Sequence, residues 1–190
     1  MIKGVLTGFA LLLFCFTAAA AQIGDCAAIP HDTKVAEVGA FSDMRETGEH
    51  AYGYTVMLWR AGTCLLGIFV AAEGLAADTP IGRLQAVKYD QKGGALSFSA
   101  KLTTGLMRLE GSKDLEPSRD LFTFDGHLKP AQLTGRVRHA NLGNPSFKPI
   151  DKHVVLRASK EDAEVMRGAT TYGEWRAKWE PILRVRGPKW

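Results

Sequence analysis

The amino-acid sequence predicts a mainly β protein, an antiparallel meander of about eight strands that closes into a small barrel and is followed by a C-terminal α-helix. Three observations support this fold class. Short segments of alternating apolar and polar residues recur between turn residues at intervals of about 8–15 residues. No helical pattern separates these segments, which argues against parallel strands joined by crossovers. The helical pattern appears only after residue 158.

The first 21 residues have the pattern of a signal peptide. Lys3 is the only charge before a mostly apolar run from 5 to 16, and Ala19 to Ala21 supply the small-x-small cleavage pattern. The run is too short for a membrane span, which needs about 20 residues. Cleavage leaves 190 − 21 = 169 residues, a usual size for one domain. We therefore expect a secreted or periplasmic protein without a transmembrane segment, with residues 22–158 forming the barrel domain and 159–190 a docked helical segment.

Two cysteines remain after cleavage, because Cys15 lies in the predicted signal peptide. Cys26 and Cys64 are then the only pair in a chain sent to an oxidising compartment, so they are expected to form a disulfide. In the chain-entropy model, closing this loop contributes about 3–4 kcal/mol to stability.

The predicted strands cover residues 35–41, 51–60, 64–72, 81–89, 95–102, 120–128, 133–138 and 153–158. The alternation is clearest in 95–102, where Leu96 and Phe98 lie on one face and Ser97 and Ser99 on the other, so one face of this strand meets water. Residues 42–50 are predicted to form a loop. Residues 103–119 are predicted to form a polar loop with one short strand around Met107.

Closure into a barrel is preferred because it removes exposed strand edges. About eight strands leave an interior that side chains fill or that holds one small ligand. A two-sheet sandwich is the alternative. In architecture alone, the order of signal peptide, meander, single disulfide and aromatic C-terminal helix resembles lipocalin-like barrels. The motif residues of that family do not occur at matching positions, so the sequence assigns no family.

The C-terminal helical segment carries two capping-box spacings, Ser159 with Asp162 and Thr171 with Glu174. After the second, one apolar stripe follows at helical spacing, formed by Tyr172, Trp175, Trp179 and Ile182. The stripe predicts a helix that packs against the outside of the sheet. The alternative is an aromatic surface for a partner or membrane interface. Pro181 is expected to bend or end the helix.

No established catalytic or metal-binding spacing is present, so the sequence predicts a non-enzymatic protein without a cofactor or metal. The strongest exception is a polar group in which Asp125 and His127 share one strand face with Thr123. His139 lies across the next turn and is expected to approach His127, which would allow metal binding or acid–base chemistry. Solvent-facing polar pairs give the same pattern.

Charge is uneven along the chain. Residues 22–128 carry 10 Lys/Arg and 14 Asp/Glu, whereas residues 129–190 carry 13 and 6. The basic residues of the C-terminal part are spread through predicted strands and loops, which is typical of a solvated surface. A polyanion site is the alternative, and an exported protein is not expected to meet nucleic acid.

Ligand binding at the barrel mouth is the leading functional hypothesis, because apolar pockets with few polar groups favour that position. The ligand would be small and apolar or amphipathic. Phe98, Phe122 and Phe124 would form the wall, and Tyr52, Tyr54 and Trp59 would supply polar contacts. The same rings would otherwise fill the interior. The alternative is an interaction or inhibitor protein whose outer surface binds a protein or envelope polymer. An enzyme whose catalytic residues follow no established spacing is the third possibility.

Overall fold

The computed structural model describes residues 26, 28–76, 79–108 and 113–190, so the predicted signal peptide lies outside the described residues. The strands are β1 (Val35–Ser42), β2 (Arg45–Thr47), β3 (His50–Ala61), β4 (Cys64–Leu75), β5 (Ile81–Tyr89), β6 (Ala95–Leu102), β7 (Leu106–Arg108), β8 (Leu115–Pro117), β9 (Asp120–Lys129), β10 (Gln132–Asn141) and β11 (Ile150–Ala158). The helices are α1 (Lys160–Met166) and α2 (Tyr172–Arg186).

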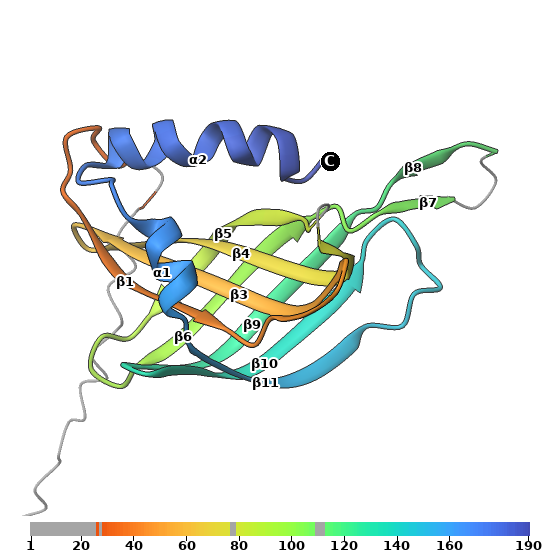
Figure 1. Ribbon diagram of the computed structural model, residues 1–190, viewed down its shortest axis with the longest axis horizontal. Helices are drawn as coiled ribbons and strands as arrows, with labels where there is room; N and C mark the ends of the chain where they lie inside the picture. The colour runs from red at the N-terminus through yellow and green to blue at the C-terminus, as the bar shows by residue number, and fades with distance from the viewer. Residues whose placement is uncertain (1–25, 27, 77–78, 109–112) are drawn as a thin grey trace, which may run out of the picture.

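Eight strands form a closed antiparallel barrel in the ring order β1, β3, β4, β5, β6, β9, β10, β11 (Figure 1). The predicted barrel is confirmed, and the alternative sandwich is not adopted. Strand β2 pairs with β3 outside this ring. The contact that closes the ring is short, because β1 meets β11 only where Phe41 pairs with Ala158 and Ser42 with Arg157.

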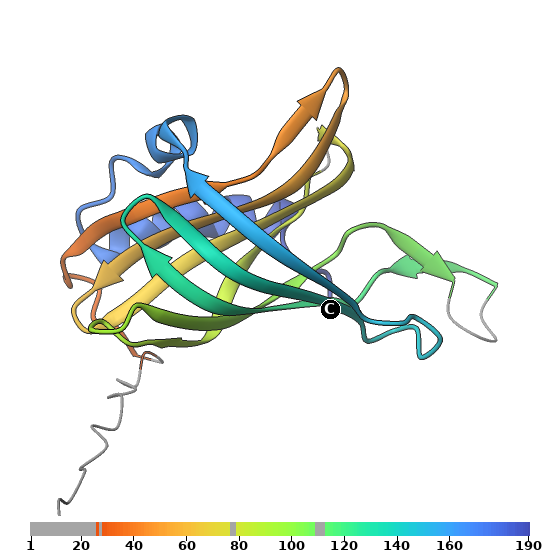
Figure 2. The ribbon, with the colours of Figure 1, turned by 90° about the horizontal axis from the view of Figure 1, so that it is seen from below.

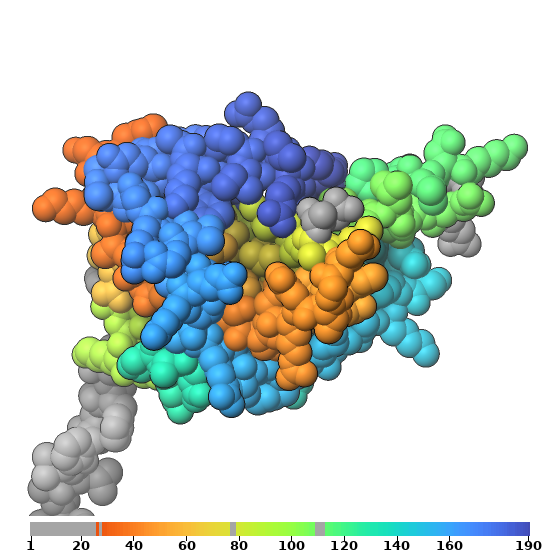
Figure 3. All heavy atoms as spheres, viewed as in Figure 1, coloured from red at the N-terminus to blue at the C-terminus, as the bar shows by residue number. Residues whose placement is uncertain are grey.

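Two segments differ from the predicted loops. Residues 42–50 contain β2, whose three residues are all exposed, so no apolar alternation marks it. In residues 103–119 the short strand predicted around Met107 is confirmed as β7, whereas β8 was not predicted, and the two strands pair only with each other among the described strands. The β7–β8 hairpin stands away from the barrel (Figure 3). Strand β11 also begins at Ile150, three residues before the predicted start.

The barrel interior holds a core of closely packed aromatic rings. Phe98 and Phe124 stack with 5.1 Å between ring centroids, and Phe69 lies 5.4 Å from Phe122. Aliphatic side chains surround these rings, among them Leu58, Leu102, Leu133 and Leu156. The aromatic residues expected to line or fill the bore therefore pack against one another.

The helices cover the outside of the barrel (Figure 1). Trp59 points outward from β3 and makes edge-to-face contacts with Trp175 and Trp179 of α2, at 5.8 and 5.4 Å between centroids. The capping box of Thr171 and Glu174 begins α2, as predicted. None of the helices in the described part of the chain has the length and apolar content needed to cross a membrane.

Pro181 does not end α2, which continues to Arg186. Of the two predicted outcomes, the end of the helix at Pro181 is wrong, and a bend there stays a prediction. The proline lies on the exposed side of the helix, so the backbone carbonyl that loses its donor, that of Ala177, also lies in an exposed residue. Packing of Trp179 and Ile182 on the opposite side holds the two halves of the helix against the barrel.

The predicted disulfide between Cys26 and Cys64 is confirmed, with 5.7 Å between the Cα atoms. It attaches the N-terminal segment to the start of β4. Nearby, the amide of Val35 donates to the carbonyl of Thr170 and the amide of Tyr172 to that of Thr33, both at 2.8 Å. The start of the barrel and the start of α2 are therefore joined by hydrogen bonds as well as by packing.

Candidate functional site

Polar side chains gather inside one end of the otherwise apolar barrel. We call this end the polar mouth and define it by Tyr54, Glu73, Asp120, His139 and Lys152. Strand register explains the gathering, because directly opposed residues point to the same face. Tyr54 is opposite Ala71, His139 is opposite Phe122 and Lys152 is opposite Val137, and these three partners belong to the interior core.

An ion pair crosses the polar mouth. The Nζ atom of Lys152 on β11 lies 3.2 Å from Oε1 of Glu73 on β4. These strands are not neighbours, since β1 and β3 lie between them in the ring. The Lys152 ammonium also lies 5.8 Å from the centroid of the Tyr54 ring. Both charged side chains remain about half exposed, so the pair contributes little to stability and its partners can be exchanged.

The hydrogen-bonded wall is incomplete beside the polar mouth. Strand β1 reaches β11 only at Arg157 and Ala158, so β11 has β10 as its one strand partner from Ile150 to Leu156 among the described strands. Figure 2 shows β11 diverging from β1 and β3 toward this end. Lys152 therefore projects from a strand edge that is open on one side.

Burial raises the pKa of Tyr54 above its usual 10.0, with the nearby Lys152 charge opposing and the Glu73 charge adding to the rise. For Lys152, burial lowers the pKa, but the hydrogen bond to Glu73 and the neighbouring charges outweigh it, so the net pKa is raised. At neutral pH the mouth therefore presents a neutral phenol donor beside a charged ammonium.

The buried Asp120 side chain is the centre of a hydrogen-bond network. Its Oδ2 accepts from the Thr104 hydroxyl at 2.7 Å, from the Thr104 amide at 3.1 Å and from the Ser118 hydroxyl. Its Oδ1 accepts from Asn141 Nδ2 at 3.0 Å and contacts His139 Nε2 at 2.9 Å. Burial raises the pKa of this carboxyl, but the hydrogen bonds from His139, Ser118 and Thr104 outweigh it and lower the pKa to about 2.

His139 lies between aromatic rings, 4.2 Å from Phe122 and 5.0 Å from Phe147 between centroids. Its side chain is 9% exposed. Because Nε2 faces an ionised carboxylate, this nitrogen carries the proton and donates. The other nitrogen, Nδ1, is buried and finds no hydrogen-bond partner among the described residues. Nδ1 is therefore an unsatisfied buried polar atom, among the described residues, at one end of the barrel interior.

The network does not have the order of a nucleophile, base and orienting acid. The Ser118 hydroxyl donates to Asp120 directly, whereas His139 contacts the other carboxylate oxygen. A nucleophile activated by a histidine base requires its hydroxyl to contact the imidazole directly. The arrangement instead anchors the segments that lead into and out of the β7–β8 hairpin.

The sequence prediction missed Asp120, Glu73 and Lys152. A signal was present for the inward position of His139, because it continues the inward series of Leu133, Gly135 and Val137 on the same strand. Sequence spacing alone did not connect Lys152 with Glu73, which lies 79 positions earlier.

The six predicted ligand residues do not line one cavity. Tyr54, Phe98, Phe122 and Phe124 are buried inside the barrel. Tyr52 lies at the rim, exposed and stacked with His50 at 6.3 Å. Trp59 belongs to the outer cluster beneath α2, so its expected place as a polar contact inside the bore is corrected. Side chains alternate between the two faces along β3, so Trp59 points outward whereas Tyr54 points into the barrel.

The predicted polar group is divided between two faces. Thr123, Asp125 and His127 share the outer face, but the predicted approach of His139 to His127 is wrong. His127 is opposite Thr134, whereas His139 is opposite Phe122 and points inward. Within the described ranges, no three His, Cys, Asp or Glu side chains are placed to hold a metal ion.

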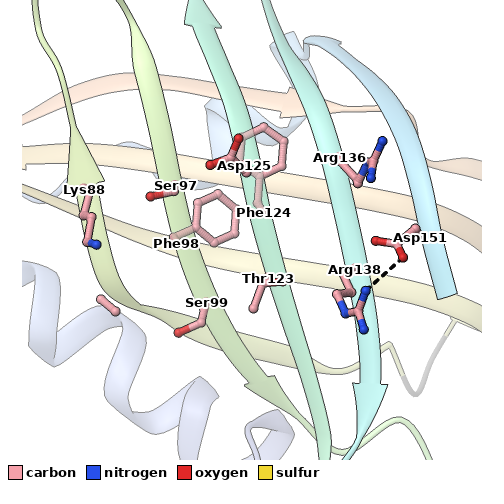
Figure 4. A pocket seen from close by; sticks show the side chains of 11 residues that line it. Lys88, Ser97, Phe98, Ser99, Thr123, Phe124, Asp125, Arg136, Arg138 and Asp151 are labelled. Carbon is pink, nitrogen blue, oxygen red and sulfur yellow. Dashed lines mark hydrogen bonds and ion pairs between the residues drawn. The ribbon is translucent and has the colours of Figure 1, made fainter. Parts of the chain in front are cut away.

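A hollow lies on the outer wall of the barrel. It has a volume of about 450 Å³ and spans β5, β6, β9, β10 and the start of β11 (Figure 4). We call it the outer groove and define it by Lys88, Ser99, Thr123, Asp125, Arg136 and Arg138.

Comparisons of the chain with protein-family models, with curated proteins and with solved structures found no match.

Proposed function

We propose that the protein is an exported, non-enzymatic binding protein that holds a small amphipathic ligand at the polar mouth. The observation that carries this proposal is the Lys152–Glu73 ion pair, which crosses the mouth above the buried Tyr54 ring. Export is supported by the signal-peptide pattern of residues 1–21 and by the Cys26–Cys64 disulfide, since disulfides persist in oxidising compartments.

The ligand head group is proposed to be a carboxylate. It would bind the Lys152 ammonium in place of Glu73 and accept a hydrogen bond from the Tyr54 hydroxyl. Glu73 then acts as an intramolecular competitor that occupies the cation when the ligand is absent. A ligand polar group that reaches His139 Nδ1 would also pair a buried atom that has no partner among the described residues, which relieves a desolvation cost.

The apolar part of the ligand is proposed to lie on the rim, because the bore is filled by the protein's own side chains. Large apolar side chains are exposed at strand ends around the mouth: Tyr52 (49%), Leu75 (53%), Leu142 (57%) and Ile150 (40%). An exposed group of this kind at one end of a barrel is typical of a binding surface.

Titration of the mature, disulfide-bonded protein with a fluorescent long-chain carboxylate tests the proposal. Lys152→Met should weaken binding about tenfold or more, because a charge-assisted hydrogen bond is lost. Glu73→Gln should strengthen binding, because the competing carboxylate is removed. The methyl ester of the probe should bind the parent protein more weakly than the acid does, and Lys152→Met should remove this difference.

Lys129→Met is the matched control, since it removes the same charge from an exposed position at the end of β9. It should leave the affinity unchanged. Absence of saturable binding, equal losses in Lys152→Met and Lys129→Met, or weaker binding in Glu73→Gln would each overturn the proposal.

A further inference from the structure

The outer groove is a separate feature from the polar mouth, because its side chains point away from the bore. Phe98 and Phe124 also line the groove, although both belong to the buried core of the barrel. Strand β5 has an irregularity between Gln85 and Lys88, where Ala86 adopts a φ of 48°. Such a bulge redirects the side chains that follow it, and here it sets Lys88 opposite Ser97 at one border of the groove.

Strand register arranges the groove in two rows. In one row Ser97 is opposite Asp125, which is opposite Arg136. In the next row Ser99 is opposite Thr123, which is opposite Arg138. The middle positions are thus mostly short hydroxyl side chains and the borders are long cationic ones. Two strands, β6 and β9, lie between β5 and β10. The backbones of the two strands that carry the cationic side chains are therefore about 14 Å apart.

The cationic side chains of the groove differ in whether they form ion pairs. Arg138 is held by Asp151, with Nη1 and Oδ2 3.1 Å apart. Lys88 and Arg136 are exposed and make no ion pair with any residue in the described ranges. Asp125 is exposed and likewise has no ion-pair partner there. Figure 4 shows the Arg136 and Arg138 side chains along one border, with Asp125, Ser99 and Thr123 toward the centre.

These groups select a polar ligand with spaced negative charges. Of the residues that line the groove, Ala86 is the one exposed residue with an apolar side chain, so a lipid chain or an apolar peptide would gain little contact with apolar side chains there. Asp125 and Asp151 oppose a uniformly charged polyanion. Hydroxyl-rich ligands suit the groove better, because Asp125 accepts hydrogen bonds from hydroxyls while Ser99 and Thr123 both donate and accept. Arginine pairs a carboxylate through two parallel hydrogen bonds.

We propose that the outer groove binds a strand of an acidic polysaccharide, with a sugar carboxylate on Arg136 and sugar hydroxyls on Thr123 and Asp125. Lys88 binds a second carboxylate at the opposite border. The site shares no residue with the polar mouth, so either proposal can fail while the other holds.

Calorimetric titration of the mature protein with oligogalacturonate tests this assignment, at about 0.15 M salt so that distant charges are screened. The neutral comparison ligand is a galactose oligomer of the same length, and polyphosphate is the uniform polyanion. Arg136→Gln should weaken oligogalacturonate binding about tenfold or more. Lys129→Gln, which removes an exposed charge outside the groove, should change it less than about twofold.

Asp125→Ala separates sugar recognition from simple charge attraction. The substitution should weaken oligogalacturonate binding, because an acceptor for hydroxyls is lost, and should strengthen polyphosphate binding, because a negative charge is removed. The assignment is overturned by no detectable oligogalacturonate binding, by equal affinity for the neutral oligomer, or by equal losses in Arg136→Gln and Lys129→Gln. Tighter oligogalacturonate binding in Asp125→Ala would also overturn it.

Discussion

The imidazole of His139 stacks on the ring of Phe122, with 4.2 Å between centroids and 9° between planes. Phe122 in turn contacts Phe69 at 5.4 Å and Tyr54 at 6.3 Å. The polar mouth and the aromatic core are therefore one continuous packed unit. Replacing a ring in the core is expected to disturb the mouth as well.

Phe122→Ala should lower the free energy of unfolding by about 3–5 kcal/mol, because Phe122 is fully buried and a cavity would remain. Urea unfolding followed by circular dichroism measures this change. Val155→Ala, on the exposed face of β11, is the control and should stay within about 0.5 kcal/mol of the parent. A small loss combined with binding of an apolar dye by the parent protein would instead indicate a cavity-lining ring.

Asp120 should make stability depend on acid pH. Its pKa falls from an ordinary 3.8 to about 2 in the folded protein, so its contribution is complete above pH 4 and is lost as the pH falls toward 2. The contribution amounts to about 2 kcal/mol. Urea midpoints measured at several values between pH 6 and pH 2 should therefore fall, and Asp120→Asn should flatten this part of the profile.

Asp125→Asn is the matched control for that measurement, because Asp125 is exposed on the outer wall. An Asp120→Asn protein that kept the parent's full slope between pH 4 and 2 would contradict the assignment.

Helix α2 should be an integral part of the fold. Trp175 is fully buried against Trp59, so Trp175→Ala should cost about 3–5 kcal/mol. Val185→Ala, at an exposed position of the same helix, should change stability by less than about 0.5 kcal/mol. Thermal unfolding compares the two variants. A protein truncated at Ser159 that melted at the parent temperature would show that the aromatic stripe serves a partner.

The disulfide should protect the native protein from alkylation and stabilise it. Cys26→Ser should lower stability by about 2–5 kcal/mol, because the unfolded chain gains freedom when the loop is opened. Mass spectrometry after treatment with a thiol reagent, with and without prior reduction, measures both thiols. Full labelling of Cys26 and Cys64 in unreduced exported protein would contradict the bond.

Local patterns were sufficient to predict most of the barrel. The alternation from Leu96 to Leu102 defined β6, and the spacing of Thr171 and Glu174 defined the start of α2. Strand β2 was missed because its residues are exposed on both sides, so its pairing with β3 leaves no mark in hydropathy. The predicted end of α2 at Pro181 was wrong because the proline lies on an exposed face, and that exposure depends on docking, which the local sequence does not encode.

The candidate site was less predictable because it depends on which strands meet. Asp120 and Thr104 are brought together only when the β7–β8 hairpin leaves the barrel between β6 and β9. Lys152 and Glu73 meet only because the ring closes. The outer position of Asp125 followed from alternation, whereas the opposed directions of His127 and His139 required the register of the β9–β10 hairpin.

The two-pair junction of β1 with β11 has a kinetic consequence. Phe41 and Ala158 are separated by 158 − 41 = 117 positions, whereas the other pairings of the ring join segments that are close along the chain. Contacts between distant segments form late, since a long loop must close before they contribute. We therefore expect newly exported chains to pass through a curled open sheet whose two lateral edges are still bare. Once β1 pairs with β11, these two edges are no longer exposed. The chain can then no longer pair through them with other chains.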